Sequence, residues 1–371
     1  MSDTAYPVFQ HYGTAAQRAA FTPAPPATGQ PIYLWYETDT GNTYLYDSAW
    51  HALSGGGSFS TPEPQGRLTL TTAVPFLVST VTAATTIYYT PAVGNIVPLY
   101  NGTSFVPTTF TELSQVTTDN TKSPAAVANN SNYDLFVWSD SGTLRCTRGP
   151  AWTSDTGRGT GAGTSELVRT NGILLNTVNI TNGPAASRGT YVGSVRSNGS
   201  AQIDMIFGGA GGAGGEGTIL GIWNMYNRQL VNLVNFDNTN TWTYTTATWR
   251  LKNESASAEL NKIKFLIGLR GDGIAAWNYA LFSNTSTSVS GSVAIGLNSI
   301  TAIAIGQATG RGIASVSTAI YAFSSHYAAV APLGFNYVAP LEQATATGTA
   351  TWYGDNGGTD FYSIFTAQTM F

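Results

Sequence analysis

Residues 149–172 read GPAWTSDTGRGTGAGTSELVRTNG, and the interpretation of the whole chain starts from this stretch. Glycines alternate with small or charged residues at positions 157–163, which is too much glycine for a helix. At such glycines the backbone can adopt positive φ or approach another segment closely. Trp152 precedes them, and residues 166–168 return to strand character. We therefore predict a long ordered connection between two strands of a β-rich module.

The composition limits the class of protein to which the chain can belong. The 371 residues are 42% hydrophobic, which allows a sizeable core, and 12% aromatic. Only 10% are charged, whereas about a quarter is usual. Disordered chains combine high charge with few aromatics, so that class is excluded. An all-β protein fits, with a surface hydrated by hydroxyl and amide groups or covered by copies of itself. The net charge of −4 argues against nucleic acid as a partner.

Neither membrane insertion nor a disulfide framework is expected. The sequence has no run of 18 apolar residues, and residues 1–10 lack the basic start and apolar core of a signal peptide. The single cysteine, Cys146, is expected to be a small core residue. We therefore expect a chain that is made in a cytoplasm and does not insert into membranes.

The N-terminal segment, residues 1–57, contains the clearest hairpin. Residues 32–36 read IYLWY, residues 43–46 read TYLY, and TDTGN between them is a turn sequence. Because a two-stranded ribbon cannot bury aromatic side chains on both faces, we expect this segment to dock onto another protein or another copy. The run SGGGS at 54–58 predicts a hinge at its end. The predicted docking residues are Tyr33, Trp35, Tyr44, Tyr46 and Trp50.

The remainder is predicted to form a small β unit at residues 58–117 and a jelly-roll-like β-sandwich module at residues 118–371. The first contains short strands separated by prolines. The second has a turn about every ten residues, which is typical of sandwiches, and no sustained helical periodicity. The predicted fold class is therefore all-β.

Five strings of residues resemble those of bacteriophage tail and fibre proteins. The strings are PQGRLTL at 64–70, TTIYYTP at 85–91, GPAW at 149–152 with its glycine-rich continuation, WTYTTATWR at 242–250 and TWYGDNG at 351–357. The N-terminal aromatic hairpin is also similar to segments of virion fibres. The resemblance implies a homotrimeric, β-rich virion component that contacts other phage tail or head proteins through its N-terminal segment. A host surface glycan is a further partner to consider, and no catalytic residue is implied.

A trimer is also plausible on physical grounds. Glycine and threonine let three chains pack closely, and contacts between chains would cover aromatic faces. Residues 289–310 begin with alternating small and apolar residues, as an edge strand at an interchain contact would. An ordinary core strand within one chain explains the pattern equally well, and both interpretations stay open.

Motifs that suggest a cofactor or a metal have simpler explanations. Residues 208–217 match G-x-G-x-x-G twice, but no helix clearly follows, and a loop is preferred over a dinucleotide site. The three histidines are far apart and lack partners at zinc-ligand spacing. Residues 355–360 could supply calcium ligands, but a hydrated turn explains them better. The tripeptide Arg-Gly-Asp at 270–272 is also interpreted as a turn. No cofactor or metal is predicted.

Catalysis is not predicted either, because a polysaccharide-cleaving enzyme would need paired carboxylates. The spikes that cleave polysaccharides are usually long β-helices, and the sequence lacks a repeat of fixed period. Six arginines form the main basic concentration, for which local pairing is preferred over a patch for anionic sugar. The candidate acids are Asp204, Glu216, Asp237 and Asp272, and the arginines are Arg145, Arg148, Arg158, Arg169, Arg188 and Arg196.

The predicted function is that of a bacteriophage virion structural protein, a tail fibre or tail-attached adaptor contributing to host adhesion. A head fibre or capsid decoration protein is the first alternative. A polysaccharide-cleaving tail spike is the second.

Overall fold

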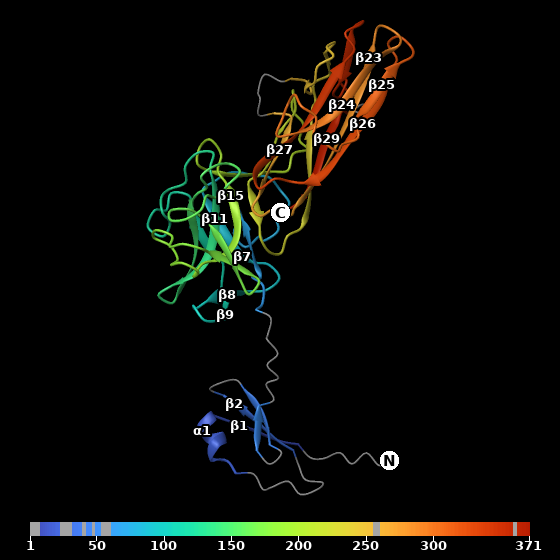
Figure 1. Ribbon diagram of the computed structural model, residues 1–371. Helices are drawn as coiled ribbons and strands as arrows, with labels where there is room; N and C mark the ends of the chain where they lie inside the picture. The colour runs from blue at the N-terminus through green and yellow to red at the C-terminus, as the bar shows by residue number, and fades with distance from the viewer. Residues whose placement is uncertain are drawn as a thin grey trace, which may run out of the picture. The chain divides into compact units, whose positions relative to one another are not determined.

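The computed structural model describes residues 8–22, 32–38, 42–46, 49–52, 61–254, 260–358 and 362–371. It confirms the predicted all-β class, since 51% of residues are in strands and 2% in helix. The chain divides into two compact units, Met1–Ser60 and Thr61–Phe371, and each is described by itself (Figure 1). The predicted boundary at residue 57 lies outside the described residues. The predicted division at residue 117 falls inside the second unit.

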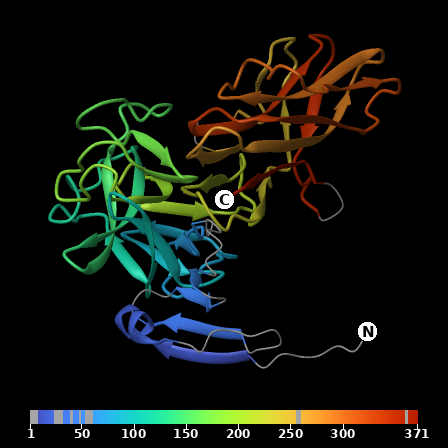
Figure 2. The same cartoon turned by 60° about the horizontal axis from the view of Figure 1, so that its bottom comes forward.

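The described residues of the smaller unit form a four-stranded sheet and one short helix (Figure 2). The sheet has the order β1 (Val8–Gly13), β2 (Ile32–Glu37), β3 (Thr43–Tyr46) and β4 (Trp50–Ala52), and α1 (Ala15–Ala20) follows β1 in sequence. The strands β2 and β3 are the predicted hairpin. β1 runs parallel to β2, which a connection through a helix permits. Thr14 begins the helix, because its hydroxyl accepts from the N–H of Gln17 while the Gln17 side chain accepts from the N–H of Thr14.

Part of the larger unit is built from three small sheets. The first has the order β12 (Thr143–Ala151), β11 (Asn132–Asp140), β15 (Thr190–Arg196), β14 (Ile173–Asn176) and β13 (Leu167–Thr170), with β18 (Ile222–Asn224) paired to β15. The second has the order β10 (Leu113–Val116), β7 (Thr86–Pro91) and β5 (Gly66–Thr69). The third is the hairpin of β8 (Ile96–Tyr100) and β9 (Phe105–Thr109).

The rest of the larger unit is a sandwich of two sheets (Figure 1). One has the order β25 (Gly310–Ala314), β24 (Val289–Leu297), β27 (Gly334–Ala344), β22 (Lys262–Ile267), β17 (Gly217–Leu220), β16 (Ile203–Ile206) and β6 (Val81–Ala84), with β21 (Arg250–Leu251) paired to β27. The other has the order β19 (Leu230–Phe236), β29 (Ile364–Met370), β23 (Gly273–Asn284), β28 (Ala350–Tyr353) and β20 (Thr241–Thr243), with β26 (Tyr321–Val330) paired to β23. Phe282 and Trp352 of the second sheet pack with Val293 of the first.

A large hydrophobic cluster connects distant parts of the larger unit. It joins Leu68, Phe136 and Trp223 to Phe265 and Phe371, which come from sheets far apart in the sequence. In addition, β6 pairs with β16 in the sandwich. Residues 61–117 therefore share the core, and through β6 one sheet, with the later chain.

The glycine-rich stretch is the predicted ordered connection. It leaves β12 after Ala151 and enters β13 at Leu167. Its glycines at 159, 161 and 163 have φ of 80°, 82° and 79°, values that strongly favour glycine. Trp152 is 6% exposed. The connection is held by Arg158, whose Nε is 2.6 Å from Asp134 Oδ2 and whose Nη2 donates to the carbonyl of Gly268 at 2.5 Å.

The strand predicted at either an interchain edge or a core position is a core strand. Val289–Leu297 is β24, and it pairs with β25 on one side and β27 on the other. Eight of its nine residues are buried. The interior interpretation is therefore correct, because both edges of this strand are occupied within the same chain.

Candidate binding surfaces

The five predicted docking residues lie on one face of the sheet in the smaller unit. Tyr33 is opposite Tyr46, Trp35 is opposite Tyr44, and Trp50 is opposite Tyr46 on the next strand. Since side chains alternate along a strand, this register puts all five on the same side. The ring centroids of Tyr46 and Trp50 are 5.2 Å apart, and those of Trp35 and Trp50 are 6.1 Å apart.

The chain itself covers much of this face. The ring centroid of Phe21, next to the end of α1, lies 5.4 Å from that of Trp35. The Arg18 guanidinium lies 3.8 Å from the centre of the Tyr44 ring, and its Nε is 2.6 Å from Oε1 of Glu37. Trp35 is therefore only 5% exposed. The five residues form much of a small internal core, and their role in docking stays a prediction.

The opposite face of the same sheet, here called the outer face, carries Tyr12, Leu34, Tyr36, Thr43 and Leu45. Tyr12 is 68% exposed and Tyr36 is 42% exposed, with ring centroids 6.2 Å apart. Four of these residues line a shallow pocket. The hairpin pattern alone did not reveal this surface, because Tyr12 reaches it only through the parallel pairing of β1 with β2, for which the sequence carries no local signal.

In the larger unit, the glycine-rich segment at 208–217 surrounds carboxylates of its own chain. The N–H groups of Gly209 and Ala210 donate to Glu216 at 3.1 Å each, and the N–H of Gly214 donates to Asp237 at 3.0 Å. The strand β17 follows this segment instead of a helix. A bound phosphate would need these same N–H groups. Because they already donate to Glu216 and Asp237, the segment is a structural turn.

The four candidate acids have structural partners. Glu216 and Asp237 are held by the glycine-rich segment, as described. Asp204 accepts from Nδ2 of Asn198 at 2.8 Å. Asp272 accepts from Arg228 and from the indole N–H of Trp223. Arg270 and Gly271 lie exposed in a turn, as predicted for the Arg-Gly-Asp tripeptide.

The six clustered arginines are engaged locally, as preferred from the sequence. Three pair with aspartates and three donate to backbone carbonyls. The pairs are Arg145–Asp140, Arg158–Asp134 and Arg196–Asp155, and the carbonyl donors are Arg148, Arg169 and Arg188. They do not form one open basic patch.

Among the described residues, no three His, Cys, Asp or Glu side chains gather where they could hold an ion. Asp355 accepts from the N–H of Gly357 at 2.9 Å in a turn, and Asp360 lies outside the described part. Within the described ranges, no helix is long and apolar enough to cross a membrane.

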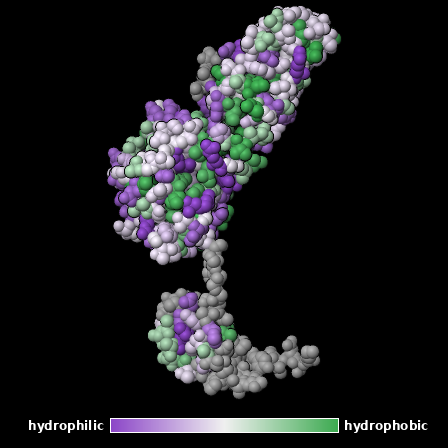
Figure 3. Space-filling view, in the orientation of Figure 1, coloured by the Kyte–Doolittle hydropathy of each residue, from purple (hydrophilic) through white to green (hydrophobic). Residues whose placement is uncertain are grey.

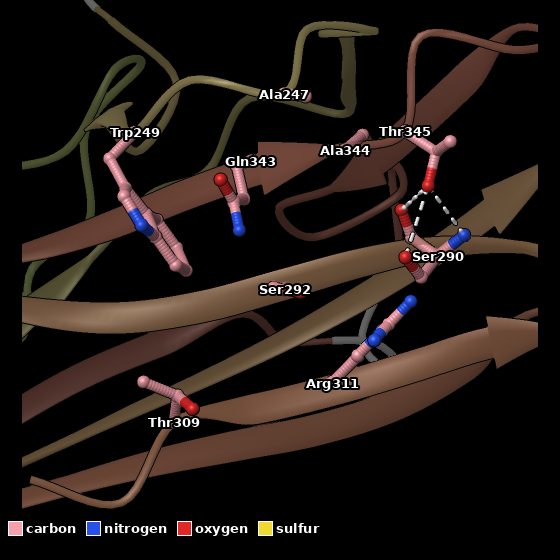
Figure 4. A pocket seen from close by; sticks show the side chains of 9 residues that line it. All are labelled: Ala247, Trp249, Ser290, Ser292, Thr309, Arg311, Gln343, Ala344 and Thr345. Atoms are coloured by element: carbon pink, nitrogen blue, oxygen red, sulfur yellow. Dashed lines mark hydrogen bonds between the residues drawn. The ribbon is translucent and has the colours of Figure 1, made fainter.

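A groove of about 380 Å³ lies over β24, β25 and β27, here called the sandwich groove (Figure 4). It is mostly polar. Its lining comes from four segments far apart in sequence, so the sequence could not have revealed it. The lining residues are Ala247, Trp249, Ser290, Ser292, Thr309, Arg311, Gln343, Ala344 and Thr345.

A second groove of about 590 Å³ contains more basic groups. Arg196 in its wall pairs with Asp155 and lies 4.5 Å from the ring centre of Phe335. The amino group of Lys262 lies 4.8 Å from the ring centre of Tyr337. The basic groups of this groove therefore already have partners within the protein.

Buried charges join the two sheets of the sandwich. Glu342 on β27 accepts from the indole N–H of Trp242 on β20 at 2.9 Å and from Nε of Arg250 at 2.9 Å. Burial raises the pKa of Glu342 to about 7. Burial also lowers the pKa of Lys252 to about 8, and its Nζ donates to Ser363 Oγ at 2.9 Å. These contacts give the two groups a structural role.

Comparisons with known proteins do not identify a family. No family model matches the chain, and no curated protein matches it. One solved structure, a tryptic core variant of Cry1Da from Bacillus thuringiensis, aligns at a TM-score of 0.16 and 7% identity. The alignment covers 89% of this chain and 57% of that one. Similarity this low carries no argument about fold or function.

Proposed function

We propose that the chain is a structural component of a bacteriophage virion, a tail fibre or tail-attached adaptor that contributes to host adhesion. The observation that carries the proposal is the division of the chain into a small unit with an exposed aromatic sheet face and a large β unit. In this proposal the small unit attaches the protein to the particle, and the large unit projects and makes contacts.

Attachment is assigned to the outer face of the smaller unit. Tyr12 and Tyr36 expose aromatic rings next to Leu34, and tyrosine is among the residues that contribute most at protein interfaces. The proposed partner is another phage tail protein. The predicted residues Trp35 and Trp50 support this face from behind through the internal core.

Trimerisation belongs to the same proposal. The sandwich carries several exposed apolar side chains, and Figure 3 displays hydrophobic patches over that part of the molecule. Contacts with sister chains would cover them. The mass of the purified protein in solution tests this point, and a monomeric mass at micromolar concentration would contradict it. The exposed side chains are Ile303, Ile305, Ile313, Val316, Ile320 and Val330.

A head fibre or capsid decoration protein would use the same attachment chemistry at another place on the particle. Imaging of labelled particles separates the two, because the label would lie on the tail in one case and on the head in the other. No observation favours the polysaccharide-cleaving spike over these two.

The attachment role is tested with Tyr36→Ser, and Tyr279→Ser serves as the matched control. The two tyrosines are 42% and 37% exposed, and Tyr279 lies in the larger unit. Particles assembled with each variant are purified, and their content of the protein is measured by immunoblot. We expect Tyr36→Ser to reduce incorporation severalfold and Tyr279→Ser to leave it unchanged. Equal incorporation of the two variants would contradict the assignment.

A further inference from the structure

We infer that the sandwich groove binds an acidic saccharide whose negative charge is a carboxylate. The inference deepens the proposed function, on which its meaning as a contact with the host surface rests. The binding chemistry itself is argued from the groove alone.

The groove is built on a row of three polar side chains. Ser292 on β24 pairs in register with Arg311 on β25 and with Gln343 on β27, so the three lie side by side across three strands. Because they share a register row, they point to the same face of the sheet. Figure 4 places Trp249 beside Gln343 at one end of the row. The Ser290–Thr345 pair lies near Arg311, two residues along the chain from Ser292 and Gln343. The three strands are paired in one sheet, which fixes the backbone that carries these groups.

The charge of Arg311 makes the groove selective for an anion. Its side chain is exposed, and it makes no hydrogen bond or ion pair with another described residue. None of the nine lining residues is acidic. The neighbouring Glu342 points to the opposite face of β27 and is paired there with Arg250 at 2.8 Å. The guanidinium is therefore an open, forked donor of the kind that binds a carboxylate through two hydrogen bonds.

The remaining groups match a polyhydroxyl ring. Trp249 packs against the cluster of Leu251, Ala294 and Leu341, which fixes its indole ring at the wall of the groove. A fixed aromatic surface suits the apolar face of a sugar ring. The amide of Gln343 makes no hydrogen bond to a described residue, and it can both donate and accept.

Two hydroxyl groups extend this set. The hydroxyl groups of Ser290 and Thr345 lie 3.0 Å apart. The Thr345 hydroxyl also accepts from the N–H of Ser290 and donates to its carbonyl, so it is fully engaged, whereas the Ser290 oxygen can still accept a hydrogen bond. The groove volume of about 380 Å³ lies within the range of about 300–1,000 Å³ usual for small-ligand sites. Its lining is more polar than is usual for such sites, which suits a ligand rich in hydroxyl groups. An apolar peptide would find no apolar pocket here.

The test is titration calorimetry of the purified full chain with tetragalacturonate, a uronic-acid oligosaccharide, in low salt. The matched ligand is the methyl-esterified tetragalacturonate, which keeps the sugar rings and removes the charges. The variants are Arg311→Gln and Trp249→Ala, and Arg270→Gln is the control because Arg270 is also exposed and lies outside the groove. Circular dichroism confirms that each variant is folded.

We expect the protein to bind tetragalacturonate. Its affinity for the esterified ligand should be at least about tenfold lower, and the affinity of Arg311→Gln for tetragalacturonate should fall by a similar factor. This is the usual effect of losing a charge-assisted hydrogen bond. Trp249→Ala should lower it severalfold, and Arg270→Gln should retain it. Absence of binding to tetragalacturonate would overturn the inference, as would equal affinities of Arg311→Gln and Arg270→Gln. Because this assay uses no particles, its failure is distinguishable from a failure of attachment, which is measured with Tyr36→Ser.

Discussion

Replacement of Arg158 by Met should strongly destabilise the larger unit. Arg158 holds Asp134 through Nε at 2.6 Å and Nη2 at 3.0 Å, and it also donates to Tyr191 at 3.1 Å. Asp134 is fully buried, and Arg158 is 9% exposed. Met keeps much of the length and apolar character of the arginine side chain, so the main loss is the charge that compensates the buried carboxylate.

The magnitude follows from that geometry. Removal of one partner from a buried ion pair leaves an uncompensated charge, which costs about 3–5 kcal/mol. Removal of both charges avoids this penalty, so the double variant Arg158→Met/Asp134→Leu should lose much less than Arg158→Met alone. The free energy of unfolding is measured by urea titration with far-ultraviolet circular dichroism. Arg169→Met is the control, because the Arg169 side chain is exposed and, among the described residues, donates to the carbonyl of Gly172 alone.

Two results would refute this reasoning. One is a loss below about 1 kcal/mol for Arg158→Met, which is the range of an exposed pair. The other is a double variant that loses as much as the sum of the two single variants, because the coupling between the charges would then be absent.

Three further predictions concern the buried groups Glu342, Trp352 and Cys146. Burial raises the pKa of Glu342 from 4.5 to about 7. Between these two pH values the folded state therefore binds more protons than the unfolded state. The free energy of unfolding should accordingly fall as the pH rises from about 4.5 to 7. Glu342→Gln should flatten this part of the pH profile, and an unchanged slope would contradict the assignment. Trp352→Ala should lower the free energy of unfolding, measured by urea titration, by about 3–5 kcal/mol. The reason is that the Trp352 side chain is fully buried and its ring centroid lies 5.0 Å from that of Phe282. A loss near zero would exclude Trp352 from the sandwich core. Cys146 should resist a thiol reagent in the folded protein and react after unfolding, because burial raises the pKa of its thiol to about 12. Fast labelling of the native chain would argue against this burial.

Local patterns in the sequence were sufficient for several features. The β-rich class, the hairpin of β2 and β3, and the connection through residues 149–172 follow from strand periodicity, turn residues and glycine spacing, which act over a few neighbours. The resemblance to phage fibres and the trimer remain proposals.

Pairing between distant segments decided the rest. The aromatic hairpin predicts two faces, but only the addition of β1, α1 and Phe21 determines that Trp35 is covered and that Tyr36 is exposed. In the same way, Trp249, Arg311 and Gln343 become neighbours only because β21, β24, β25 and β27 meet in one sheet. The physical reason is that side-chain alternation defines which residues share a face, whereas the contacts that bury one face and leave the other open come from segments whose approach no local pattern encodes.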